Sequence, residues 1–120
     1  MKYEDLYKEF IALFPEDTSF FDERCKETLA EESDGMHIMF GMVVAPFIIK
    51  CVKEDETKAR LALDFIEKME ISDNHLISEV AEFSIIEAII GEGKSFVDKA
   101  ISYMGTNTQK AIKTISKWYN

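Results

Sequence analysis

Residues 76–90 read LISEVAEFSIIEAII, and this stretch decides the fold. Its apolar side chains fall on every side of a helix with 3.6 residues per turn, not along one stripe. A helix that is apolar nearly all round has to be surrounded by other elements. The stretch therefore predicts a central buried helix, whose carboxylates Glu79, Glu82 and Glu87 each need a partner or an outlet to solvent.

The segments before this stretch also have helical spacing. Residues 3–14 carry apolar side chains at i, i+3, i+4 and i+7, and Pro15 ends that helix. A second helix is expected to begin at Ser19, because Ser19 followed by Asp22 resembles a capping box.

A long apolar segment follows at residues 36–52. Because Ala45 precedes Pro46, it is biased away from helical geometry. We therefore expect two short helices, or one helix kinked near Ala45.

Turn and cap residues divide the second half of the chain. Asp55 is the expected N-cap of a helix over residues 56–69, and residues 72–74 form a tight polar turn before the central helix. Helices are expected over residues 95–104 and from Thr106 onward, where the spacing of Thr106 and Gln109 fits a capping box. The last helix should bury one face, made of Ala111, Ile112, Ile115, Trp118 and Tyr119.

No segment alternates apolar and polar residues as a half-buried strand would, so the fold class is all-α. The 120 residues are enough for one ordinary domain, and the 47% hydrophobic content is globular. We expect a single domain over residues 1–120, with six to seven antiparallel helices around the buried one. A bundle and a HEAT-like stack of helix pairs both fit this pattern.

The formal net charge of −9 argues against nucleic acid and against an anionic membrane surface as partners. Residues 1–35 carry eleven acidic and four basic side chains, whereas residues 91–120 carry two acidic and five basic ones. The acidic field would steer a basic protein partner, and an acidic surface kept only for solvation explains the same charges. The residues expected to bind such a partner are Asp22, Glu23, Glu27 and Glu31.

Cys25 and Cys51 lie in apolar helical contexts without a zinc-binding spacing, which indicates reduced structural thiols. The N-terminal segment is acidic where a signal peptide is apolar. The most apolar run, residues 36–49, is short for a membrane span and contains Pro46, so we interpret it as a core segment. These features predict a cytoplasmic protein.

Two groups of residues could carry chemistry. His75, Glu79 and Glu82 could bring metal-binding side chains near one face of a helix, although the chain has no HExxH pair. We favour a structural role for these residues, and expect no metal and no cofactor. The second group could supply paired carboxylates for acid–base catalysis, namely Glu67, Glu70, Glu82 and Glu87.

These carboxylates have a structural explanation as well. Glu82 and Glu87 are expected to bond to Arg60, to a nearby lysine or to free amides at the start of a neighbouring helix. The chain also lacks a nucleophile elbow and a complete phosphate-binding loop. The protein is therefore more consistent with a non-enzymatic role.

Four stretches together resemble a family of small, acidic, all-helical bacterial proteins of unknown function. They occur in the order HIMFGMVVAPF (37–47), LDFIEKME (63–70), VAEFSIIEAI (80–89) and MGTNTQKAI (104–112). Members of that family look like helical proteins that accompany toxin and other conflict systems. The resemblance implies no catalytic residue.

The leading hypothesis is a non-enzymatic protein–protein interaction module, with an immunity protein that masks a basic toxin as one form of it. A metal-binding protein or metal-dependent enzyme that uses His75, Glu79 and Glu82 is the first alternative. The second is a homo-oligomeric structural protein, such as a homodimer that buries Trp118.

Overall fold

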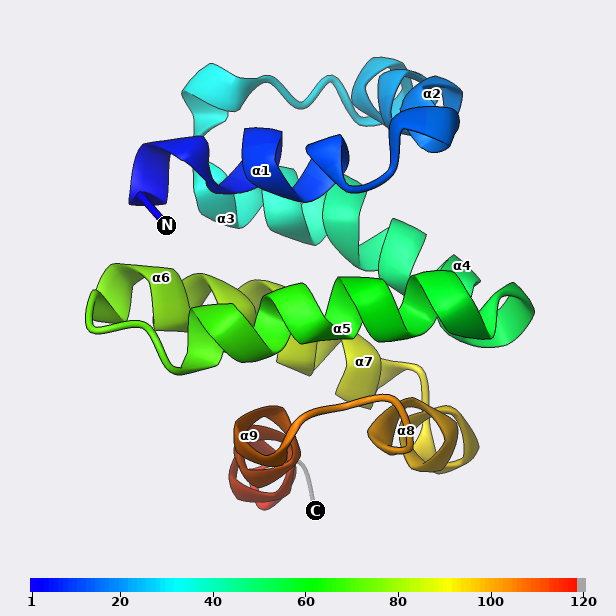
Figure 1. Cartoon of the computed structure of the whole chain (residues 1–120), viewed down its shortest axis with the longest axis vertical. Coiled ribbons are helices and arrows are strands. Elements are labelled where there is room, and N and C mark those ends of the chain that lie inside the picture. Colours follow the sequence, from blue (N-terminus) through cyan, green and yellow to red (C-terminus); the bar gives the residue numbers. More distant parts are fainter. Residues whose placement is uncertain (119–120) are drawn as a thin grey trace.

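A computed structural model describes residues 1–118, and they are helical with no strand. The all-α prediction is therefore confirmed. The helices pack into one body with a Cα radius of gyration of 13.2 Å and extents of 34 × 32 × 23 Å. Figure 1 shows the N-terminal helices, up to about residue 34, at one end, residues 36–91 in the middle, and the C-terminal helices, from residue 94, at the other end.

The N-terminal helices are shorter than the sequence suggests. After a 3-10 turn at Tyr3–Asp5, α1 spans Leu6–Ala12. A second 3-10 turn at Pro15–Asp17 leads into α2 (Thr18–Thr28). The expected capping box of Ser19 and Asp22 is absent, and α2 begins one residue earlier without a side-chain cap.

The apolar segment forms one continuous helical stretch: α3 (Met36–Met39), a π-helical segment η4 (Phe40–Val44) and α4 (Ala45–Glu54). Of the two expected alternatives, two separate short helices is wrong, because Ala45 has helical angles, with φ −57° and ψ −47°. Pro46 has no N–H to give to the carbonyl of Met42, four residues earlier. The Arg24 guanidinium of α2 donates two hydrogen bonds to that carbonyl, at 3.0 and 3.3 Å.

This continuous stretch, Met36–Glu54, is long and apolar enough to cross a membrane by length and composition alone. The apolar run expected from the sequence, residues 36–49, is therefore shorter than the helical stretch in the structure. Just over half of its most apolar window is buried inside the fold, and core helices of soluble proteins pass the same test. The stretch is weak evidence for a membrane span.

The expected Asp55 cap is present, and one residue of the polar turn 72–74 caps the next helix. Asp55 accepts a hydrogen bond from the backbone N–H of Lys58 at the start of α5 (Glu56–Glu70). Asn74 accepts one from the N–H of Leu76 at the start of α6 (His75–Val80).

The stretch that begins with α6 continues through a second π-helical segment, η5 (Ala81–Ile86), into α7 (Glu87–Gly91). Its inner residues Ile77, Val80, Ile85 and Ile86 are at most 1% exposed, which agrees with a core helix. The expectation that it is surrounded on all sides is wrong, because Leu76 and Phe83 are exposed. Helices α8 (Lys94–Ile101) and α9 (Thr106–Ser116) cover only part of this stretch.

The end of α9 also differs from expectation. Trp118 is 83% exposed, so it does not belong to the buried face of the last helix. Ala111 and Ile112 are buried as expected, and Tyr119 lies outside the described residues.

The ring of Phe10 lies at the centre of the N-terminal half of the core. Phe10 is fully buried, and its ring centroid lies 5.2–6.4 Å from those of five other rings. These rings are Phe14, which follows α1, Phe21 of α2, Phe40 of η4, Phe47 of α4 and Phe65 of α5. Phe10 therefore fixes α1 against four other elements of the fold.

Replacing Phe10 by alanine should lower the free energy of unfolding by about 3–5 kcal/mol, because the change removes a buried ring and leaves a cavity. Urea unfolding followed by circular dichroism measures this loss. The matched control is Phe83→Ala, which truncates a ring that is 58% exposed and should change stability by about 0.5 kcal/mol or less. Equal losses in the two variants would contradict the central position of Phe10.

Candidate functional site

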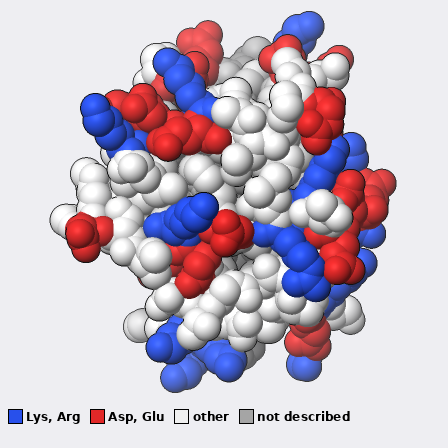
Figure 2. Space-filling view, viewed as in Figure 1, with Lys and Arg blue, Asp and Glu red and all other residues white. Residues whose placement is uncertain are grey.

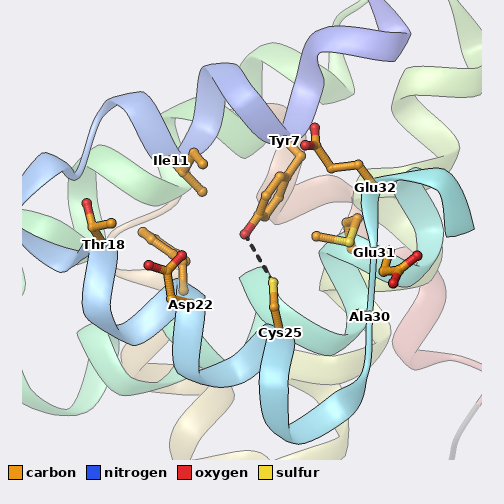
Figure 3. Close-up of a pocket in the computed structure, with 10 residues that line it drawn as sticks. Tyr7, Ile11, Thr18, Asp22, Cys25, Ala30, Glu31 and Glu32 are labelled. Atoms are coloured by element: carbon orange, nitrogen blue, oxygen red, sulfur yellow. Dashed lines mark hydrogen bonds between the residues drawn. The ribbon is translucent and has the colours of Figure 1, made fainter.

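A cavity of about 310 Å³ lies between α1, α2 and the segment that follows α2 (Figure 3). Helix α1 contributes Tyr7 and Ile11, and Met39 of α3 closes the inner end. We call this cavity the acidic cleft. Its other lining residues come from α2 and the following segment: Thr18, Phe21, Asp22, Cys25, Ala30, Glu31 and Glu32.

Local backbone geometry fixes the position of the segment after α2, which forms one wall of the acidic cleft. Leu29 ends α2 with φ +61°, a left-handed conformation that is uncommon for a residue other than glycine. The chain then runs extended through Glu31, whose N–H donates a 2.8 Å hydrogen bond to the Asp34 carboxylate in a reciprocal capping box. Gly35, with φ +99°, turns the chain into α3. The positions of Ala30, Glu31 and Glu32 are thereby fixed beside α2.

The cleft combines apolar walls with carboxylates. Ile11, Phe21 and Met39 provide apolar surface, and the hydroxyl oxygen of Tyr7 lies 3.8 Å from Sγ of Cys25 (Figure 3). Its three charged lining residues are Asp22, Glu31 and Glu32, and no Lys, Arg or His of the described chain lines it.

The pKa of Tyr7 in the cleft is raised above its ordinary value. Burial is the largest cause that raises this pKa, followed by the contact with Cys25 and by the negative charges of Glu32 and Asp22. The phenol therefore stays protonated at neutral pH. The same field favours a cation inside the cleft.

A second cavity, of about 160 Å³, is lined by side chains of both charges. Its carboxylates, Asp17, Glu54 and Asp55, are accompanied by Lys50 and Lys58. Nζ of Lys58 lies 2.7 Å from Oδ2 of Asp17, so its charge is compensated within the chain.

Cys51 lines this second cavity, and burial raises the pKa of its thiol to about 12. The thiol is therefore protonated and unreactive at neutral pH. The second cavity thus has cationic side chains in its lining, unlike the acidic cleft, and its thiol is not a nucleophile at neutral pH.

The acidic cleft includes two of the four residues predicted to bind a partner. Asp22 and Glu31 line it, whereas Glu23 and Glu27 are exposed on α2 outside it. Glu27 pairs with Arg24 at 3.3 Å. The sequence pattern did not single out Tyr7 and Cys25 as cleft residues, because both have the spacing of helix residues that face a core.

The candidate metal ligands do not form a three-residue group. Within residues 1–118, no three His, Cys, Asp or Glu side chains are arranged to hold a metal ion. His75 is exposed at the start of α6, while Glu79 and Glu82 are partly buried. The pKa of Glu82 is raised, first by burial and then by the charge of Glu79.

Glu67 of α5 caps the start of α9. Its carboxylate accepts four hydrogen bonds of 2.7–3.1 Å, two from backbone N–H groups and two from side chains of Asn107 and Thr108. Glu67 thus bonds to the free amides of a neighbouring helix, a kind of partner that was one expectation for Glu82 and Glu87. Gly105 permits the approach, because a Cβ there would lie 2.6 Å from Cδ of Glu67.

Glu70, one turn further along α5, has a different environment. One of its carboxylate oxygens, Oε1, is buried with no hydrogen-bond partner in the described chain. Burial raises the pKa of Glu70 to about 8, and the charges of Glu82 and Glu67 add to this effect. Glu70 lines none of the cavities described for the chain, so no site for a substrate accompanies it.

Replacing Glu67 by glutamine should destabilise the protein by about 1–2 kcal/mol at neutral pH, because the change removes a charged cap. Burial alone would raise the pKa of Glu67, but the hydrogen bonds from Asn107 and Thr108 lower it below 4.5. The stabilisation is therefore complete above the unfolded value and is lost as the pH falls through the lower folded value. Chemical denaturation of wild type and variant at several pH values measures this difference. A difference that does not shrink in acid would contradict a role for the charge.

Replacing Glu70 by glutamine should have the opposite pH dependence. The folded pKa of about 8 lies above the ordinary value of 4.5, so the folded state retains a proton that the unfolded state loses. Wild-type stability should therefore fall as the pH rises between these values and level off above about 8. Glutamine mimics the protonated side chain, so E70Q should match wild type in acid and exceed it in alkali. Thermal melts across this range measure the effect, with the exposed Glu4→Gln as the control that should not change the slope.

The comparison with protein families gives one match. Residues 7–119 match the model of the family described as Domain of unknown function (DUF7674), and the chain belongs to this family. Neither the curated proteins nor the solved structures contain a significant match to the chain.

Proposed function

We propose that the protein is a non-enzymatic interaction module that binds a basic protein by receiving a lysine or arginine side chain in the acidic cleft. One observation carries this proposal: three acidic residues are among those that line a cavity of about 310 Å³, and no cationic side chain of the described residues lines it. An added cation would gain the attraction that the lining residues leave unused.

The shape of the cleft fits the same occupant. Lysine and arginine have an aliphatic stem and a charged head, and they bury the stem against apolar surface. Ile11, Phe21 and Met39 would contact the stem, and the carboxylates of Asp22 and Glu32 would face the head. Glu23 and Glu27, on the exposed side of α2, extend the negative field that steers a basic partner.

The sequence resemblance suggests one biological role for such a module, that of an immunity protein that masks a basic toxin. The family match leaves the role open, since its description is a domain of unknown function. A bacterial cytoplasm is the setting in which such a protein would act.

A defined probe tests the cleft directly. Titration with Nα-acetyl-lysine methylamide, followed by amide NMR, should shift the signals of Tyr7, Cys25 and Glu31. Nα-acetyl-norleucine methylamide has a similar stem without the charge and should leave these signals unchanged. D22N/E32Q should weaken lysine binding about tenfold, because two of the three charges are lost.

Equal shifts with both probes, or lysine-specific shifts only at other residues, would count against the proposed site. Capture from a lysate of the source organism then tests the protein partner. A basic polypeptide released by salt should be retained by wild type and by the control D73K/D98K, and lost from D22K/E31K. Its equal retention by D22K/E31K would contradict the proposed function.

A further inference from the structure

The face of α5 that points to solvent carries apolar side chains beside a hollow. The hollow lies between α1 and α5, has a volume of about 450 Å³ and is lined by Leu13, Leu61 and Phe65 among others. A second hollow of about 490 Å³, over the turn after α5, shares Met1 and Lys68 with the first. In Figure 2, uncharged atoms cover much of the surface between α1 and α5, with acidic and basic groups interspersed around it.

Four residues define this face, which we call the α5 face: Leu61, Asp64, Lys68 and Ile71. Leu61 is 39% exposed and Ile71 is 60% exposed, and both lie beside a hollow. Asp64 and Lys68 are largely exposed and form an ion pair of 3.3 Å along the helix. The face thus has an exposed apolar residue at each end and two opposite charges between them.

The order of these residues is self-complementary. Leu61 precedes Asp64 by three positions, and Lys68 precedes Ile71 by three. If a second α5 lies antiparallel, one register therefore places Asp64 opposite Lys68 and Leu61 opposite Ile71. A two-fold axis repeats every such contact, as in the isologous interfaces of homodimers.

We propose that the α5 face is a two-fold interface with a second copy of this chain. Charge complementarity selects a second copy, because each Asp64 would meet Lys68 of the other molecule while the apolar ends cover one another. The hollow beside Leu61 leaves room for the Ile71 side chain of the second copy.

The two other positive charges on this helix are already engaged within the chain, and Lys58 pairs with Asp17 at 2.7 Å. The guanidinium of Arg60 lies 5.0 Å from the ring centroid of Tyr103, and its Nε lies 3.0 Å from Glu56. Arg60 therefore does not add a charge to the α5 face, where Asp64 and Lys68 remain the charged residues.

This inference is independent of the proposed function. Tyr7 and Ile11 of α1 line the acidic cleft, whereas Glu9, Ala12 and Leu13 line the hollow beside α5. The two surfaces therefore use different sides of α1, and a dimer through the α5 face leaves the lining of the cleft free.

A charge exchange between two variants tests the antiparallel register. In D64K the α5 face carries two lysines, and in K68D it carries two aspartates, so each variant alone meets like charges across the two-fold axis. Sedimentation equilibrium should give a dimer Kd about tenfold weaker for each variant than for wild type. An equimolar mixture of D64K and K68D should recover the wild-type affinity, because every cross-axis pair is again opposite in charge.

The mixture separates the interface from effects within one chain. Both variants lack the ion pair along α5, so a change in the monomer cannot explain recovery on mixing. A second pair of variants tests the apolar ends: Leu61→Ser should weaken the dimer about tenfold, and Leu29→Ser, at an 82% exposed leucine elsewhere, should not.

A wild-type protein that stays monomeric up to about millimolar concentration would overturn the proposal. So would a dimer whose Kd is the same in wild type, D64K, K68D and Leu61→Ser, because that dimer would use another face.

Discussion

The packing of Phe10 against its neighbours is the constraint on which the rest of the N-terminal half depends. Its ring is completely buried and contacts rings from α2, η4, α4 and α5. Helix α1 is only seven residues long and would not be stable alone, so its position depends on this packing. With Phe10 inside, α1 presents Tyr7 and Ile11 to the acidic cleft and Leu13 to the hollow beside α5. The two surfaces proposed for binding, the acidic cleft and the α5 face, thus both depend on the position that this buried ring gives to α1.

Two basic side chains, Arg24 and Lys58, bond within the fold, and neither lines the acidic cleft. Arg24 is the arginine of α2, yet its guanidinium bonds to the carbonyl of Met42 because Pro46 cannot. Lys58 is similarly held by Asp17 in the second cavity. Asp22, Glu31 and Glu32 therefore line a cavity that no positive charge of the described chain lines, and in the proposed function a partner supplies the counter-ion.

The two glutamates at the end of α5 show how position decides the behaviour of one residue type. Glu67 meets the free amides at the start of α9, which hold its pKa below the ordinary value. Glu70 is three residues away, is turned into the fold without a partner for Oε1, and has a pKa of about 8. Backbone donors stabilise the charged form of the first, and desolvation disfavours the charged form of the second.

Local sequence is enough to predict the helical class, the core character of residues 76–90, the cap at Asp55 and the polar turn 72–74, because these depend on local spacing and on side chains near in the chain. It also indicated that Asp22, Glu23, Glu27 and Glu31 lie in an acidic field. Long-range packing, which local patterns do not show, makes Phe83 and Trp118 exposed and Ala45 helical, and lets Glu67 cap α9. These outcomes depend on which residues meet across gaps of 18 to 41 positions, as Arg24 meets Met42 and Glu67 meets Thr108. Periodicity along the chain specifies a face of a helix, but the packing of that face against distant residues decides what covers it.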